Sequence, residues 1–168
     1  MSTVTAGLHG AFLTALQGRV VTHTDLDRKP LSVDLALPLP PRLRIYMYSL
    51  VEGGPGRPFE YKVIVRVPGQ EAGKYGSFDH TGNRLAVLMA YRADLDVFVL
   101  WDASLHARVM YAGNVQVREE VVHRAAACGR DDQDRRLASG VIERIIACQS
   151  RTLGQALADR VGWTGGSW

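Results

Sequence analysis

The chain has 168 residues, of which 46% are hydrophobic and 22% are charged, and its formal net charge is +3. This length suits one domain with a single core, and this composition excludes a disordered chain. No apolar run approaches the about 20 residues of a membrane-spanning helix, and residues 1–10 lack the basic start and apolar stretch of a signal peptide. We therefore expect one cytoplasmic domain, residues 1–168, with no membrane partner.

The first 41 residues predict a helix followed by a proline-rich arm. Residues 6–17 place apolar side chains on one helical stripe, with Thr5 available as a cap; the stripe consists of Leu8, Phe12, Ala15 and Leu16. Residues 22–41 are rich in turn formers and end in three prolines, which a central strand excludes. Residues 42–161 then form the sheet core with C-terminal helices.

The middle of the chain carries the strand patterns. Residues 43–51 alternate, with Arg44, Tyr46 and Tyr48 opposite Ile45 and Met47, and residues 60–67 alternate more clearly, as a half-buried strand does. Apolar side chains fill residues 85–91 and 97–101 almost throughout, which indicates two strands buried on both faces and joined by a hairpin. A long polar loop covers residues 68–83, and a further strand is expected at 108–117.

The C-terminal third predicts two helices. Residues 119–127 read as a helix with two glutamates in its first turn, and residues 151–161 as a helix capped by Ser150. We expect a charged loop at 129–139, whereas residues 141–148 fit a strand or a helix. The predicted fold is α+β: a curved, mainly antiparallel sheet or partial barrel of five or six strands with flanking helices.

Two cysteines, Cys128 and Cys148, do not make a disulfide framework, and we expect both to be small buried hydrophobes in a reducing compartment. The five histidines lie far apart in the sequence, without the spacing of metal ligands. No glycine-rich loop links a strand to a helix, so no nucleotide fold is indicated. We therefore expect no metal, no cofactor and no catalytic residue.

Positive charge is concentrated in the middle of the chain. Between Arg42 and Arg92, eight Lys and Arg stand against four Asp and Glu. Arginine suits bidentate contacts with phosphate or guanine, although a preference for arginine codons would give the same excess. The candidate phosphate ligands are Arg57, Lys62, Arg66, Lys74 and Arg84.

The pair Glu60 and Lys62 resembles half of a nuclease site. Residues i and i+2 share one face of a strand, and in nucleases such a lysine orients the attacking water beside a metal held by two carboxylates. The second carboxylate would have to be Asp34 or Glu52, and neither stands at a convincing strand end. A surface ion pair along the strand explains the same two residues.

Aromatic and polar residues gather at the ends of strands and in the adjoining loops. A pocket for a base extruded from a duplex needs aromatic faces for stacking and acceptors or amides for the Watson–Crick edge. The candidates for such a pocket are Tyr61, Phe78, Asp79, Trp101, Asp102 and Asn114. Tyr61 and Trp101 fit equally well as ordinary core aromatics.

Three blocks of the sequence carry a resemblance to a known group of proteins: RPFEYKVIVRVPGQ, GSFDHTGNRLAVLMAYRADLDVFVLWDASLH and YAGNVQV. They resemble small actinobacterial modules, of the kind found in Streptomyces, that bind 5-methylcytosine DNA and act in methylation-dependent (type IV) restriction. The resemblance covers residues 42–161. It implies a reader of modified DNA, with double-stranded methylated DNA and a separate nuclease as partners.

The sequence thus favours a DNA-binding module that recognises 5-methylated cytosine by base flipping into an aromatic pocket. Two alternatives remain open at this point. One is a minimal metal-dependent nuclease that uses Glu60 and Lys62, and the other is a protein-interaction domain without a nucleic-acid role.

Overall fold

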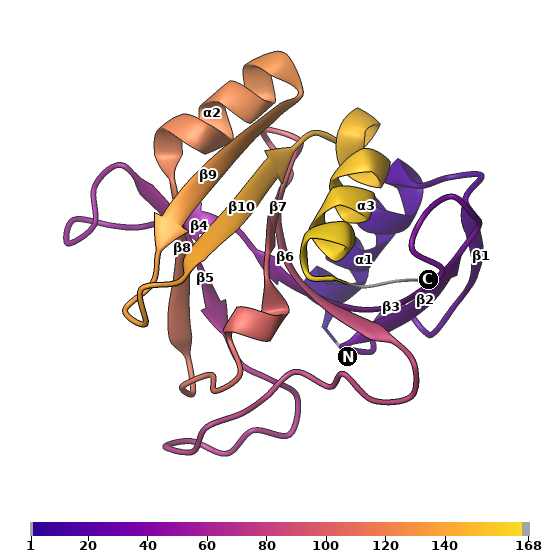
Figure 1. Cartoon of the computed structure of the whole chain (residues 1–168), viewed down its shortest axis with the longest axis horizontal. Helices are drawn as coiled ribbons and strands as arrows, with labels where there is room; N and C mark the ends of the chain where they lie inside the picture. Colours follow the sequence, from indigo (N-terminus) through magenta and orange to yellow (C-terminus); the bar gives the residue numbers. More distant parts are fainter. Residues whose placement is uncertain (1, 166–168) are drawn as a thin grey trace.

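The structure is a computed structural model that describes residues 2–165, and it is α+β, as predicted (Figure 1). Its larger sheet has seven strands in the order β1-β2-β3-β6-β7-β10-β9. These are Val20–His23, Leu31–Leu35, Arg42–Ser49, Leu85–Arg92, Val97–Trp101, Ile142–Cys148 and Arg130–Arg136. The smaller sheet has the order β4-β5-β8, formed by Val51–Glu52, Glu60–Val65 and Gly113–Arg118.

The two sheets form a more extensive structure than the five or six strands expected. Neighbouring strands pair antiparallel, except that β3 and β6 run parallel. At one corner the chain passes directly from β3 through Leu50 into β4. At the other corner, a hydrogen bond joins β8 to β9: the backbone N–H of Arg118 donates to the side-chain Oε1 of Gln133 at 2.8 Å. The described sheets therefore curve around a shared core without closing into a barrel.

The seven-stranded sheet is the central layer, and its inner strands are buried on both faces. Along β3, Tyr46 and Tyr48 join the core that lies against the smaller sheet and α2 (Glu119–Cys128). Ile45 and Met47 join the core on the opposite face, under α1 (Thr3–Ala15) and α3 (Leu153–Trp163). The alternation predicted from the sequence is correct, and it divides the interior into two cores.

The proline-rich arm is not a simple connection, because it contains β1 and β2. Along β2, Leu31, Val33 and Leu35 are buried while the residues between them are only partly covered. Pro30 precedes β2 and the other three prolines follow it, so they remove no hydrogen bond from its pairing with β3. Helix α1 also begins before the expected residue 6, and its N-cap is Ser2, whose Oγ accepts from the Thr5 N–H at 3.3 Å.

The expected charged loop at 129–139 is largely a strand, β9, which pairs with β10 along its whole length. It is an edge strand with exposed faces, so charged side chains can line it and pair across strands, as Arg144 does with Asp134 at 2.9 Å. This pairing also resolves residues 142–148 as a strand. Strand β8 begins at Gly113, later than the expected residue 108.

The end of the chain departs from the prediction in two details. A short 3-10 turn, η2 (Ser150–Thr152), precedes α3, and Ser150 does not cap the helix; its Oγ donates to Asp96 Oδ1 at 2.5 Å. Only one cysteine lies in the core: Cys148 is buried, which raises the pKa of its thiol to about 12, whereas Cys128 is exposed. Within residues 2–165, no helix is both long and apolar enough to cross a membrane.

Candidate nucleic-acid interface

Two loops protrude together from one end of the molecule, and we call them the loop pair: residues 68–84 between β5 and β6, and residues 106–112 before β8 (Figure 1). Gly76 and Val109 exchange both backbone hydrogen bonds, at 2.8 and 2.9 Å. The side-chain amide of Gln70 donates to the carbonyls of Lys74 and Val109, both at 2.8 Å. These bonds brace the two loops against each other, so side chains on their surface are held in fixed relative positions.

The surface of the loop pair combines aromatic rings with arginines. Tyr75 is 57% exposed and Met110 is 63% exposed, and Tyr111 lies beside them. The Arg108 guanidinium lies 4.2 Å from the centre of the Tyr75 ring, and that of Arg66 lies 5.3 Å from the centre of the Tyr111 ring. Such stacking leaves the guanidinium edges free to donate hydrogen bonds.

A hollow of about 150 Å³ lies between these side chains, lined by Gly73, Lys74, Tyr75, Met110 and Tyr111. Lys74 forms an ion pair with Glu71, with 2.7 Å between Nζ and Oε2. Within residues 2–165, neither Arg66 nor Arg108 forms an ion pair. Their charges therefore remain available to an anionic partner.

The predicted phosphate ligands are not all in one place. Arg66 and Lys74 belong to or adjoin the loop pair, while Lys62 lies on β5 and Arg57 lies beyond the other end of that strand. Arg84 has a structural role: it binds Asp34 at 2.8 Å and donates to the carbonyls of residues 33 and 43. The structure thus separates Arg84 from the cations that face solvent.

The predicted aromatic pocket residues are core side chains. The Phe78 ring packs edge-on against Tyr46 at 4.8 Å, and the Trp101 Nε1–H donates to the Gln116 carbonyl at 3.1 Å. Tyr61 is also buried, with its hydroxyl 3.2 Å from His123 Nε2. None of the three presents a free ring face to solvent. The exposed rings of Tyr75 and Tyr111 were both visible in the sequence, but nothing there marked them as more accessible than Phe78.

The predicted polar residues of the pocket also lie apart. Asn114 is exposed on β8, in the smaller sheet. Asp79 is exposed in the loop pair, where its Oδ1 accepts from the backbone and the hydroxyl of Thr81 and pairs with Arg44 at 3.4 Å. The Thr81 hydrogen bonds lower the pKa of the Asp79 carboxyl. Only Asp102 joins a larger polar site.

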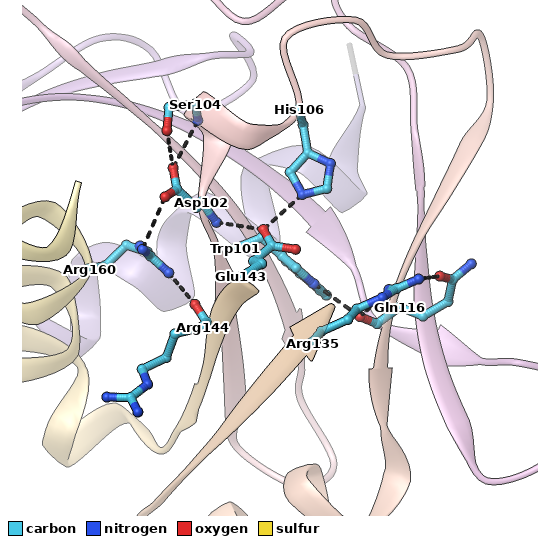
Figure 2. A network of polar contacts seen from close by, with 9 residues as sticks. All are labelled: Trp101, Asp102, Ser104, His106, Gln116, Arg135, Glu143, Arg144 and Arg160. Carbon is cyan, nitrogen blue, oxygen red and sulfur yellow. Dashed lines mark hydrogen bonds and ion pairs between the residues drawn. The ribbon is translucent and has the colours of Figure 1, made fainter. Parts of the chain in front are cut away.

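Asp102 follows β7 and anchors a buried polar network, shown in Figure 2. Its Oδ1 accepts from the Ser104 N–H at 3.0 Å and from the Ser104 hydroxyl at 2.6 Å. Its Oδ2 lies 3.3 Å from Nη2 of Arg160 on α3, and Arg160 also donates to the backbone carbonyl of Arg144. Burial lowers the pKa of Arg160, because removal from water disfavours its charged form.

A second carboxylate, Glu143 on β10, is completely buried in the same network. Its Oε2 accepts from the Asp102 N–H at 3.0 Å and lies 2.8 Å from His106 Nε2. Sequence reasoning missed Glu143, Ser104, His106 and Arg160 as site residues. The sequence did contain a signal for two of them. Glu143 on its strand and Arg160 on its helix are ionisable residues at positions where the apolar pattern predicts a buried side chain.

The network forms one wall of a cavity of about 260 Å³. Trp101, Asp102 and Arg160 lie at its buried end, and its exposed mouth includes Ser104 and Thr164. The remaining lining is mostly apolar, with Leu85, Ala86, Val87, Ala103 and Val161, and it also includes His80 of the loop pair and Gly165. Ser104 and Arg108 are four positions apart in the sequence, so their Cα atoms are at most about 14 Å apart, and the cavity adjoins the loop pair.

The structure offers little support for the nuclease arrangement of Glu60 and Lys62. Glu60 and Lys62 share a face of β5, but Glu60 pairs with Arg57 at 3.4 Å. Asp34 lies in the other sheet, bound to Arg84, and Glu52 lies opposite Tyr61 on β4. Among residues 2–165, no three His, Cys, Asp or Glu side chains gather as a metal site would require.

Residues 41–157 match the profile of a protein family described as methylase-associated X1. The matched segment runs from β3 into α3 and includes the loop pair, Asp102 and Glu143. It begins after α1, β1 and β2. No curated protein and no solved structure matches the chain.

Proposed function

The chain belongs to the methylase-associated X1 family, and we propose that it is a DNA-binding module that recognises modified cytosine. The family links the chain to DNA modification systems. The single observation that carries DNA binding is the surface of the loop pair, where two exposed tyrosines each lie beside an arginine that forms no ion pair within residues 2–165. Aromatic faces stack on bases of any sequence, and arginines bind phosphates.

The loop pair is suited to a nucleic acid because its contacts are already in place. The Gly76–Val109 bridge and the Gln70 hydrogen bonds fix the two loops before a ligand arrives. Binding therefore orders few additional groups, which reduces its entropic cost. Met110 lines the same hollow as the two tyrosines and is the kind of apolar side chain that proteins insert between base steps.

Recognition of 5-methylcytosine is the finer part of the proposal. It is supported by the methylase association and by the resemblance of residues 42–161 to modules that bind 5-methylcytosine DNA. One buried methyl group contributes about 0.8 kcal/mol, which corresponds to a severalfold preference. A stronger preference requires that the base leave the duplex and enter a shaped site.

The test is a titration of fluorescently labelled duplexes that differ only in cytosine methylation, at two salt concentrations. Tyr75→Ala should weaken binding by about 1–3 kcal/mol, the usual range for a base-stacking side chain, and Arg108→Gln should also reduce the salt dependence. Phe59→Ala removes an aromatic ring that is 78% exposed outside the loop pair, so it is the matched control and should leave affinity unchanged.

Three results would count against the proposal in different ways. Equal affinities for methylated and unmethylated duplexes would leave a general DNA-binding domain. Equal losses in Tyr75→Ala and Phe59→Ala would remove the loop pair from the interface. Absence of salt-sensitive binding would favour a protein partner, because exposed Tyr, Met and Arg are also enriched in protein interfaces.

A further inference from the structure

The cavity beside the loop pair has hydrogen-bonding capacity that its own network does not use. A carboxylate offers about four acceptor positions, and in Asp102 three are taken: two by Ser104 and one by Arg160. The guanidinium of Arg160 is nearly completely buried, and its Nε has no hydrogen-bond partner among the described residues. The buried end of the cavity therefore holds one spare anionic acceptor and one spare cationic donor.

An unpaired buried donor is costly in a folded protein, and most such groups are satisfied. The Arg160 side chain lines the cavity, so a ligand that enters can accept a hydrogen bond from its guanidinium. Much of the remaining lining consists of aliphatic side chains such as Leu85, Ala86 and Val161, which offer no hydrogen bonds. A fitting ligand thus has both hydrogen-bonding groups and an apolar part.

We propose that this cavity receives a single cytosine base extruded from the duplex, with its Watson–Crick edge toward Asp102 and Arg160. The inference rests on the proposed DNA-binding function and names the site of recognition. The cytosine amine donates to Asp102, and the adjacent ring nitrogen or carbonyl accepts from Arg160. The 5-methyl group lies next to the amine, on the neighbouring edge of the ring, and packs against the aliphatic side chains. A cavity of about 260 Å³ is below the range for drug-sized ligands and suits one base.

The same geometry sets the discrimination between pyrimidines. Thymine has a carbonyl where cytosine has the amine, so its oxygen would face the carboxylate of Asp102. An acceptor opposite an anionic acceptor is repelled, and the site therefore rejects thymine although thymine carries the same methyl group. Cytosine without the methyl group keeps both hydrogen bonds and forgoes only the packing against the aliphatic side chains.

The experiment fills the cavity without changing its charges. Ala86→Leu adds bulk to the aliphatic lining, and Thr164→Trp obstructs the exposed mouth without touching the core. Ala126→Leu on α2 is the matched control, because Ala126 is also partly buried but does not line the cavity. Each variant is first checked for a cooperative thermal transition like that of the unaltered protein.

The probes are duplexes that carry 5-methylcytosine, cytosine or thymine at one position, with 2-aminopurine beside it to report extrusion by increased fluorescence. The unaltered protein and Ala126→Leu should show the fluorescence rise and a severalfold preference for 5-methylcytosine. In Ala86→Leu and Thr164→Trp both should disappear, and the methylated and unmethylated duplexes should then bind equally, through the surface contacts alone. Preference that survives in both filled variants would overturn the cavity assignment alone, whereas failure of the unaltered protein to bind any duplex would overturn the proposed function as well.

Discussion

Replacement of Arg160 by methionine tests the energetics of the buried polar network. The Asp102 and Arg160 side chains are 10% and 5% exposed, with Oδ2 and Nη2 3.3 Å apart. Removing one partner of a buried ion pair costs about 3–5 kcal/mol, because the other charge stays buried without compensation. We expect Arg160→Met to lower the free energy of unfolding by about 3 kcal/mol, at the low end of that range, since Ser104 still donates two hydrogen bonds to Asp102.

A loss of this size is a large part of the roughly 5–15 kcal/mol that stabilises a typical domain. The double variant Arg160→Met with Asp102→Leu should lose less than the sum of its single variants, by roughly 1–3 kcal/mol, because it removes the Asp102 carboxylate that Arg160→Met alone leaves without its cation. Urea unfolding monitored by circular dichroism measures all three, and Arg124→Met on the exposed face of α2 is the control. Additive losses, or a loss in Arg160→Met no larger than in Arg124→Met, would refute the buried ion pair as an energetic unit.

Three further outcomes are expected. Replacing Lys62 and Arg66 together by glutamine should weaken binding to all duplexes alike and reduce the slope of log affinity against log salt by about 0.9 for each phosphate that is no longer neutralised. Plasmid DNA, methylated or not, should stay intact with Mg²⁺ or Mn²⁺; nicking that disappears in Glu60→Ala would instead support the nuclease alternative. Burial lowers the pKa of His9 below 6.5, against the partial opposing effect of its hydrogen bond to Leu26, so only the unfolded chain takes up a proton near pH 6. Stability should therefore fall as pH drops through 6.5, and His9→Asn should flatten that dependence in denaturant titrations at about pH 5 and 7.

Local pattern was sufficient for the elements whose side chains alternate or repeat cleanly. β3, β5, β6, β7 and α2 lie where the sequence predicted them. It was insufficient for β9, in which every residue except Gln133 is charged and which becomes a strand only because β10 supplies its backbone partners. β1 and β2 were missed for a related reason, since turn-forming residues around them outweighed the short alternation of Leu31, Val33 and Leu35.

The candidate site also has a part that the sequence predicts and a part that it does not. The sequence identified Asp102 and the cationic character of the middle third, because residue type and charge are local properties. It could not rank the aromatics: Phe78 and Tyr75 occupy the same loop, yet one ring packs on Tyr46 and the other is exposed. That difference depends on which loop residues face β3, and no repeat in an irregular loop encodes it.

By itself the sequence determined that the chain forms an α+β core, and it located the strands buried on both faces, because hydrophobic periodicity reports burial directly. Only the tertiary structure decided which polar groups meet. Asp102 is 58 residues from Arg160 and 41 residues from Glu143, and these three side chains come together because β7, β10 and α3 pack side by side. The cavity and its spare hydrogen bonds exist only through those long-range contacts, since no segment of the chain contains more than part of the network.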